Sequence, residues 1–108
     1  MAIAAQSVAD ICAQAQHASR RLGKLDTATK NAALEAMAAA LEQRADEVLE
    51  ANARDMQAGE EAGLHSGLLD RLKLTEERLA GIAADVRSIV ALPDPVGETI
   101  DGHRLENG

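Results

Sequence analysis

Few residues of this sequence could take part in catalysis or metal binding, and they are not spaced as such sites require. Cys12 is the single cysteine, so it is the only candidate thiol nucleophile. A catalytic thiolate needs a nearby base, cation or helix N-terminus, whereas Cys12 lies among alanines on an apolar stripe, with His17 five residues on and off that face. We therefore predict a structural position for Cys12, because free cysteines are usually buried.

The histidines offer no alternative centre. His17, His65 and His103 show no i,i+4 pair and no HExxH pattern, so no zinc site is predicted. None of the three has an evident partner that would make it a general base. We expect His17 on a solvated helix face, His65 in a loop and His103 in a hairpin.

Three glycines are spaced by four residues: Gly59, Gly63 and Gly67. The spacing could be a helix-packing face, but polar residues intervene. We interpret the segment as a flexible loop with helix-stop glycines. No GxGxxG or P-loop pattern occurs, so no nucleotide cradle is predicted. Across positions 1–108 the sequence therefore predicts no catalytic, cofactor-binding or metal-binding residue.

The length, charge and cysteine content of the chain exclude several classes of protein. The chain has 108 residues, enough for one domain, with 11 Lys and Arg against 18 Asp and Glu, for a net charge of -7. Such an acidic chain is a poor binder of nucleic acid or of anionic membranes. One cysteine fits a reducing cytoplasm, and we find neither a signal peptide nor an apolar run of about 18 residues. We expect a cytoplasmic protein.

The apolar content is weaker than its fraction suggests. Hydrophobic residues make up 46% of the chain, but many are alanine and there is no Phe, Trp or Tyr. Aromatic side chains dominate core energetics because each buries roughly 150–250 Å². Alanine-lined helices instead suit close packing against something larger. The composition thus indicates a layer that lacks part of its core.

Helical periodicity predicts a mainly α chain with three main helices and one short helical turn. The first helix runs from Ser7 to Leu22, with Ser7 and Asp10 as a capping box. The second begins near Asp26 or Thr27. It either runs unbroken to about Ala58 or jogs near positions 50–52.

The second half of the chain predicts a helical turn, a helix and a hairpin. A short turn covers 68–72, and Thr75 caps a last helix that Pro93 stops. The buried face of this helix is expected to be Leu79, Ile82, Ala83, Val86, Ile89 and Val90. Asp101-Gly102 is a two-residue hairpin signal between strands 96–100 and 103–106. We therefore expect a helical layer over 1–92 and a β-hairpin stub over 93–108.

Several linked motifs give the chain a family resemblance. The stretch from Leu68 to Glu98 reads LLDRLKLTEERLAGIAADVRSIVALPDPVGE. It resembles γ-glutamyl phosphate reductase in an LDRL-x-LT segment, in IA-x-DVR and in L-x-DPVG. Upstream, ANARD at 51–55 and AALEAMAAALE at 32–42 are similar to the family's ANA-x-D and second helix. These motifs occur in register over nearly the whole chain.

The resemblance implies more than the residues themselves show. It implies an aldehyde dehydrogenase-like α/β fold, and reduction of γ-glutamyl phosphate with NADPH through a cysteine thioester in proline biosynthesis. In that family the catalytic cysteine, cofactor sheet and substrate pocket lie downstream of the segment seen here. None of those residues maps onto positions 1–108, and Cys12 does not match the catalytic motif.

Two hypotheses of different class follow. In the first, the chain is a structural and inactive N-terminal fragment of such a reductase, and its apolar helix faces pack on the remainder of the enzyme or on a second copy. In the second, it is a free-standing helical dimerisation or interaction module. Such a module would cover its apolar surface by forming a homo-oligomer. A redox or metal protein is disfavoured by one cysteine and unpaired histidines.

Overall fold

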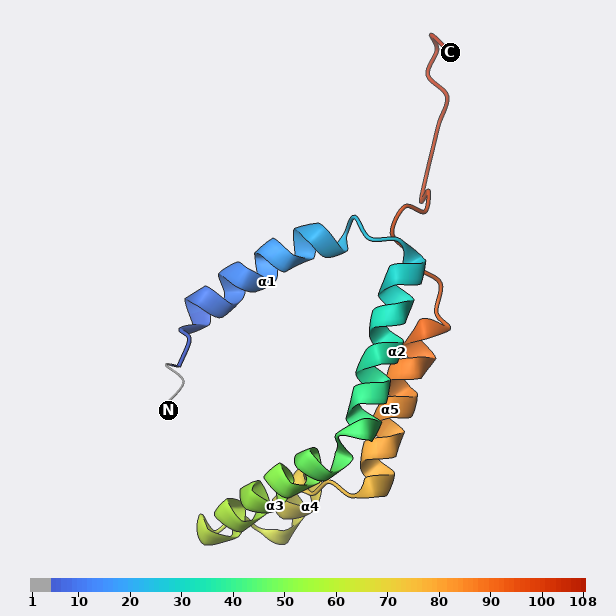
Figure 1. Cartoon of the computed structure of the whole chain (residues 1–108). Coiled ribbons are helices and arrows are strands. Elements are labelled where there is room, and N and C mark those ends of the chain that lie inside the picture. Colours follow the sequence, from blue (N-terminus) through green and yellow to red (C-terminus); the bar gives the residue numbers. More distant parts are fainter. Residues whose placement is uncertain (1–4) are drawn as a thin grey trace. The chain divides into compact units, whose positions relative to one another are not determined.

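A computed structural model describes residues 5–108, which contain five α-helices and no strand (Figure 1). The helices are α1 Val8–Leu22, α2 Thr27–Gln43, α3 Ala45–Glu61, α4 Ser66–Leu72 and α5 Glu76–Val90. Contacts divide the chain into two units, residues up to Thr27 with Pro93–Gly108, and Ala28–Leu92. No helix within residues 5–108 is long and apolar enough to cross a membrane.

Helix α1 begins and ends where its capping residues predict. The Ser7 hydroxyl accepts a hydrogen bond from the Asp10 backbone N–H at 3.1 Å and donates one to the Asp10 carboxylate at 2.6 Å. Gly23 ends the helix with φ -63°, so it stays right-handed. No residue of α1 is buried, and Val8 remains 77% exposed. The predicted apolar stripe is therefore present but uncovered in the structure.

The predicted second helix is two helices, α2 and α3, and the break between them lies at Arg44 and not near positions 50–52. Arg44 leaves helical geometry at φ -108° and ψ 25°, which separates α2 from α3. The bend costs little hydrogen bonding, because the Arg44 N–H still reaches the Ala40 carbonyl at 2.9 Å. Its guanidinium also holds Glu47 at 2.6 Å. Bends usually occur at Pro or Gly, and neither stands here, so the sequence carried no signal for this one.

After the bend, α3 contacts both α4 and α5. Gly59 lies inside α3 and is buried, so the prediction that it belongs to a flexible loop is wrong. An added Cβ there would come within 3.0 Å of Leu64 Cδ1 and 3.2 Å of Leu69 Cδ2. Gly63 does act as a helix stop, with φ 79°. The close packing of Leu64 and Leu69 against α3 favours glycine at position 59.

Helices α2 and α5 lie side by side and hold most of the small core (Figure 1). Thr75 caps α5 as predicted, its hydroxyl accepting from the Arg78 N–H at 3.1 Å. The buried hydrophobic residues among those described are Ala38, Leu79 and Ala83. Ile82 and Ile89 were predicted to be buried but are 40% and 50% exposed. The expected apolar face of α5 is therefore only partly covered.

The β-hairpin predicted over 93–108 is not formed. A two-residue type I′ turn needs positive φ at both central residues, yet no non-glycine residue among those described has positive φ, and Gly102 is not among the glycines that do. Instead the Asp101 side chain accepts from the Gly102 N–H at 2.7 Å. Two strands alone are marginal in water, and residues 5–108 offer no third strand to support them.

Glycine 81 provides a first test of this packing. It lies inside α5, and an added Cβ would meet nothing within 4 Å. We expect Gly81→Ala to raise the free energy of unfolding by about 0.4–1 kcal/mol, because alanine lowers the entropy of the unfolded chain. Urea unfolding followed by circular dichroism measures the change.

The matched control is the same substitution at Gly59, also inside a helix. There the new methyl group would crowd Leu64 and Leu69, so the propensity gain should be offset or reversed. Equal stabilisation by the two variants would contradict the close α3–α4 contact.

Candidate functional site

The residues singled out for chemistry lie apart and join no site. Cys12 is exposed on α1, so its predicted burial on an apolar stripe is not seen. His17 is exposed on the same helix, as expected. His65 caps α4 by accepting from the Leu68 N–H at 3.4 Å, while His103 lies in the segment without regular structure. Among residues 5–108 no group of three potential metal ligands occurs.

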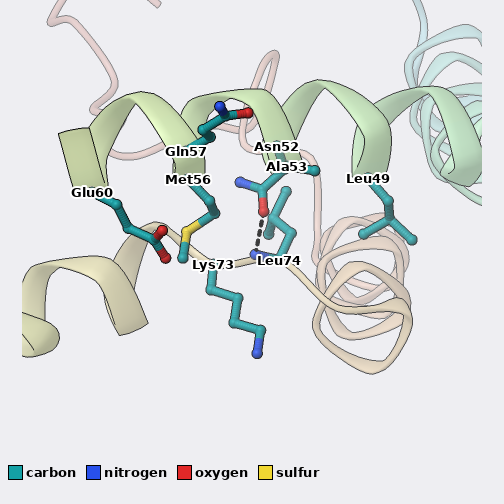
Figure 2. Close-up of a pocket in the computed structure, with 8 residues that line it drawn as sticks. All are labelled: Leu49, Asn52, Ala53, Met56, Gln57, Glu60, Lys73 and Leu74. Carbon is teal, nitrogen blue, oxygen red and sulfur yellow. Dashed lines mark hydrogen bonds between the residues drawn. The ribbon is translucent and has the colours of Figure 1, made fainter.

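The best-organised polar group is the side chain of Asn52 on α3, which is 9% exposed. Its amide nitrogen donates to the Leu72 carbonyl at 2.9 Å, and its oxygen accepts from the Leu74 N–H at 2.8 Å. Figure 2 shows the second of these bonds, with Lys73 pointing away from α3. One side chain thus satisfies two backbone groups of the α4–α5 connection and fixes its path along α3.

Arg78 holds the same connection from the α5 side. Its guanidinium donates to the carbonyls of Asp70 and Lys73 at 2.6 and 2.8 Å, and pairs with the Asp70 carboxylate at 3.1 Å. The Asp70 carbonyl lies in the last turn of α4, where carbonyls lack helical partners. Asn52 and Arg78 together therefore supply hydrogen-bond partners for backbone groups at the end of α4 and in the α4–α5 connection.

Arg87 joins α5 to α2. Its two terminal nitrogens contact both carboxylate oxygens of Glu42 at 2.6 and 2.8 Å, and its Nε contacts Glu35 at 3.2 Å. The hydrogen bonds that Arg87 donates lower the pKa of Glu42 below its ordinary value of 4.5. The same bonds, accepted by Glu42 and then by Glu35, raise the pKa of Arg87. Bidentate pairing fixes direction as well as distance, so Arg87 sets how the two helices face each other.

Two open grooves lie beside these contacts. The first runs along α3 at the Asn52 clamp, between Leu49 and Glu60 (Figure 2). The second lies at the bend between α2 and α3, and most of its lining is aliphatic. Neither groove contains Cys12 or a histidine. The arrangement offers surfaces for packing and no nucleophile with a base.

The ion pair between Arg87 on α5 and Glu42 on α2 predicts that the stability of the fold depends on pH in the acid range. Because the folded state lowers the pKa of Glu42, it favours the ionised carboxylate. That contribution is present above the ordinary pKa and is lost as pH falls through the lowered one. We expect Arg87→Met to reduce stability near neutral pH, with the difference from the parent narrowing below about pH 4. Urea midpoints measured across this range test the prediction.

A suitable control is Arg54→Met, which removes an ion pair to Glu50 within one helix. Exposed pairs of this kind contribute only about 0.3–0.5 kcal/mol. If both variants showed the same pH dependence, the Arg87 bridge would not be linking α2 to α5.

Comparison with known proteins shows that the chain is similar in sequence to a class of enzymes, the reductases. The chain is 57% identical to the γ-glutamyl phosphate reductase of Roseiflexus castenholzii over 92% of its length. It is 56% identical to that of Psychromonas ingrahamii over 87%, and 50% identical to that of Haemophilus influenzae over 88%. No protein-family model and no solved structure matches.

These matches confirm the resemblance drawn from the motifs: the chain is homologous to the N-terminal segment of γ-glutamyl phosphate reductase. It spans about a quarter of the length of these relatives, 24% and 23% for the first two. An aligned stretch of 94 residues in a chain of 108 must include positions 15–94, whichever end it omits. The clamps and both grooves therefore lie in the shared segment.

The structure gives the motif residues roles that sequence reasoning missed. Asn52 of ANARD holds the end of the LDRLKLT segment, and Arg87 of DVR holds α2. Asp94 of the DPVG motif accepts from the Thr27 hydroxyl at 2.9 Å and from the Val96 N–H at 3.0 Å. A polar residue on an otherwise apolar helix face, as Asn52 is, was the available signal. These motif residues act here as hydrogen-bonding clamps of the helical layer.

Proposed function

We propose that this chain is the non-catalytic N-terminal segment of a cytoplasmic, NADPH-dependent γ-glutamyl phosphate reductase. The whole enzyme would convert L-glutamate 5-phosphate to L-glutamate 5-semialdehyde and phosphate, a step of proline biosynthesis. Identity of 50–57% over about nine tenths of the chain carries the proposal. The segment's own contribution is a helical layer whose orientation Asn52, Arg78 and Arg87 maintain.

The residues of this segment do not fit the cofactor. A dinucleotide phosphate is commonly cradled by a glycine-rich turn between a strand and a helix N-terminus. Within residues 5–108 no strand precedes any helix. NADPH supplies a hydride when bound, and we assign its binding, the catalytic cysteine and the aldehyde dehydrogenase-like sheet to the rest of the enzyme. We propose that residues 93–108 form their hairpin only in the whole enzyme, where its sheet would supply neighbouring strands.

The proposal is tested with the purified chain and with a chimaera. Alone, the 108-residue chain should not reduce NADP in the presence of glutamate 5-semialdehyde and phosphate. Substituted for the matching segment of the Roseiflexus castenholzii reductase, it should support that reaction and restore growth without proline to a host lacking the enzyme. Turnover by the chain alone would contradict its non-catalytic role. A folded but inactive chimaera would contradict its place in a reductase.

A further inference from the structure

The groove at the bend between α2 and α3 is an uncovered and mostly apolar feature of the unit Ala28–Leu92. It measures about 760 Å³. Met37 at its edge is 57% exposed, and Leu41, Val48 and Val86 are only half-buried. Water in contact with such side chains is unfavourable by roughly 25 cal/mol per Å² of apolar surface. Burial of these side chains by another element would therefore be favourable.

The polar groups of the groove are already committed. Asn52 uses its amide on the backbone of Leu72 and Leu74, and Arg44 and Glu47 neutralise each other at 2.6 Å. A small-molecule site needs a few convergent polar groups to orient its ligand, and the groove has none to spare except Asp55, which makes no ion pair within residues 5–108. The groove therefore suits the apolar face of a polypeptide.

The charge of the chain and the length of its relatives distinguish between possible polypeptides. A second copy would bring a net charge of -7 against another -7, which opposes association. The relatives that share the groove segment are about four times as long as the chain. Asp55 at the groove would favour a Lys or Arg beside the incoming apolar residues.

We infer that the α2–α3 groove is the seat of one apolar, basic-flanked segment from the remaining three quarters of the reductase. This inference rests on the proposed function and names the partner of its helical layer. The departure of Arg44 from helical geometry forms the groove, because residues of α2 and α3 on both sides of it line the groove. The Arg44–Glu47 pair then holds the bend before the partner is seated.

Two alanines on α2 provide a matched test. Ala40 and Ala36 are both exposed in this structure, but only Ala40 lines the groove. In the chimaera, Ala40→Asp should lower the Tm by roughly 5 °C or more, because the carboxylate would be buried against the seated segment. Ala36→Asp should lower it by less than about 2 °C. In the isolated chain both substitutions should be tolerated, because positions 36 and 40 are both exposed there.

The outcomes separate this inference from the proposed function. Equal Tm values for the two chimaera variants would overturn the inference, even with reductase activity intact. A chimaera that loses stability on Ala40→Asp but has no reductase activity would support the groove and contradict the function. Sedimentation equilibrium of the isolated chain tests the other occupant. A dimer abolished by Ala40→Asp and not by Ala36→Asp would assign the groove to a second copy and overturn the inference.

Discussion

Replacing Asn52 with alanine should lower the free energy of unfolding by about 2–4 kcal/mol. The substitution leaves the Leu72 carbonyl and the Leu74 N–H without the partners they have at 2.9 and 2.8 Å. Asn52 is 9% exposed, so water replaces these bonds poorly, and each unsatisfied group costs about 1–3 kcal/mol. Urea unfolding of the 108-residue chain, followed by circular dichroism, measures the loss.

Two further variants define the mechanism of that loss. Asn52→Asp retains the acceptor for Leu74 and removes the donor to Leu72, so it should also destabilise the chain. Gln57→Ala on the same helix removes an exposed pair with Glu61 and should change stability by less than about 0.5 kcal/mol. If Asn52→Ala behaved like Gln57→Ala, the α4–α5 connection would not depend on this clamp.

Leu79→Ala should lower the free energy of unfolding by about 2–4 kcal/mol, through the loss of burial and the cavity left behind. Leu79 is 3% exposed and is the one large side chain among the buried hydrophobic residues described, which otherwise are Ala38 and Ala83. With so few buried groups, no neighbouring core residue can compensate. Thermal and urea unfolding of the variant and the parent test this expectation.

The control lies one turn further along α5. Ile82 is 40% exposed, so Ile82→Ala should cost less than half as much in the isolated chain, because less surface leaves water when it folds. A similar loss in both variants would indicate that α5 buries a different face from the one in the structure. In the chimaera the cost of Ile82→Ala should rise if the rest of the enzyme covers this residue.

Much of the local structure was predictable because it depends on neighbours in sequence. Ser7 and Thr75 start helices by accepting the backbone N–H three residues on, a rule that operates within one turn. The helical turn predicted over 68–72 is present within the longer helix Ser66–Leu72, and the stop at Gly63 follows from a similarly local preference. The motifs likewise carried the resemblance to the reductases, and comparison confirmed it.

Features that depend on distant residues were not predictable. The bend at Arg44 has no Pro or Gly to indicate it. The sequence around Gly59 predicts a loop, because it does not show that Leu64 and Leu69 pack against this glycine. Asp101-Gly102 predicted a hairpin, yet a hairpin needs neighbouring strands that residues 5–108 do not contain. The exposure of Ile82 and Ile89 likewise depends on which surface faces them.

For the candidate site, the sequence by itself determined that Cys12 and the histidines have no partners at catalytic or metal-binding spacing. It also determined the acidic charge and the aromatic-free, alanine-rich helices. Only the tertiary structure decided that Asn52, Arg78 and Arg87 are clamps, and that the α2–α3 bend forms an apolar groove. The physical reason is that caps depend on residues within one turn, and charge depends on composition alone. The Asn52 and Arg87 contacts instead join residues 20 to 52 positions apart, and Arg78 reaches 5 to 8 residues back across the α4–α5 connection.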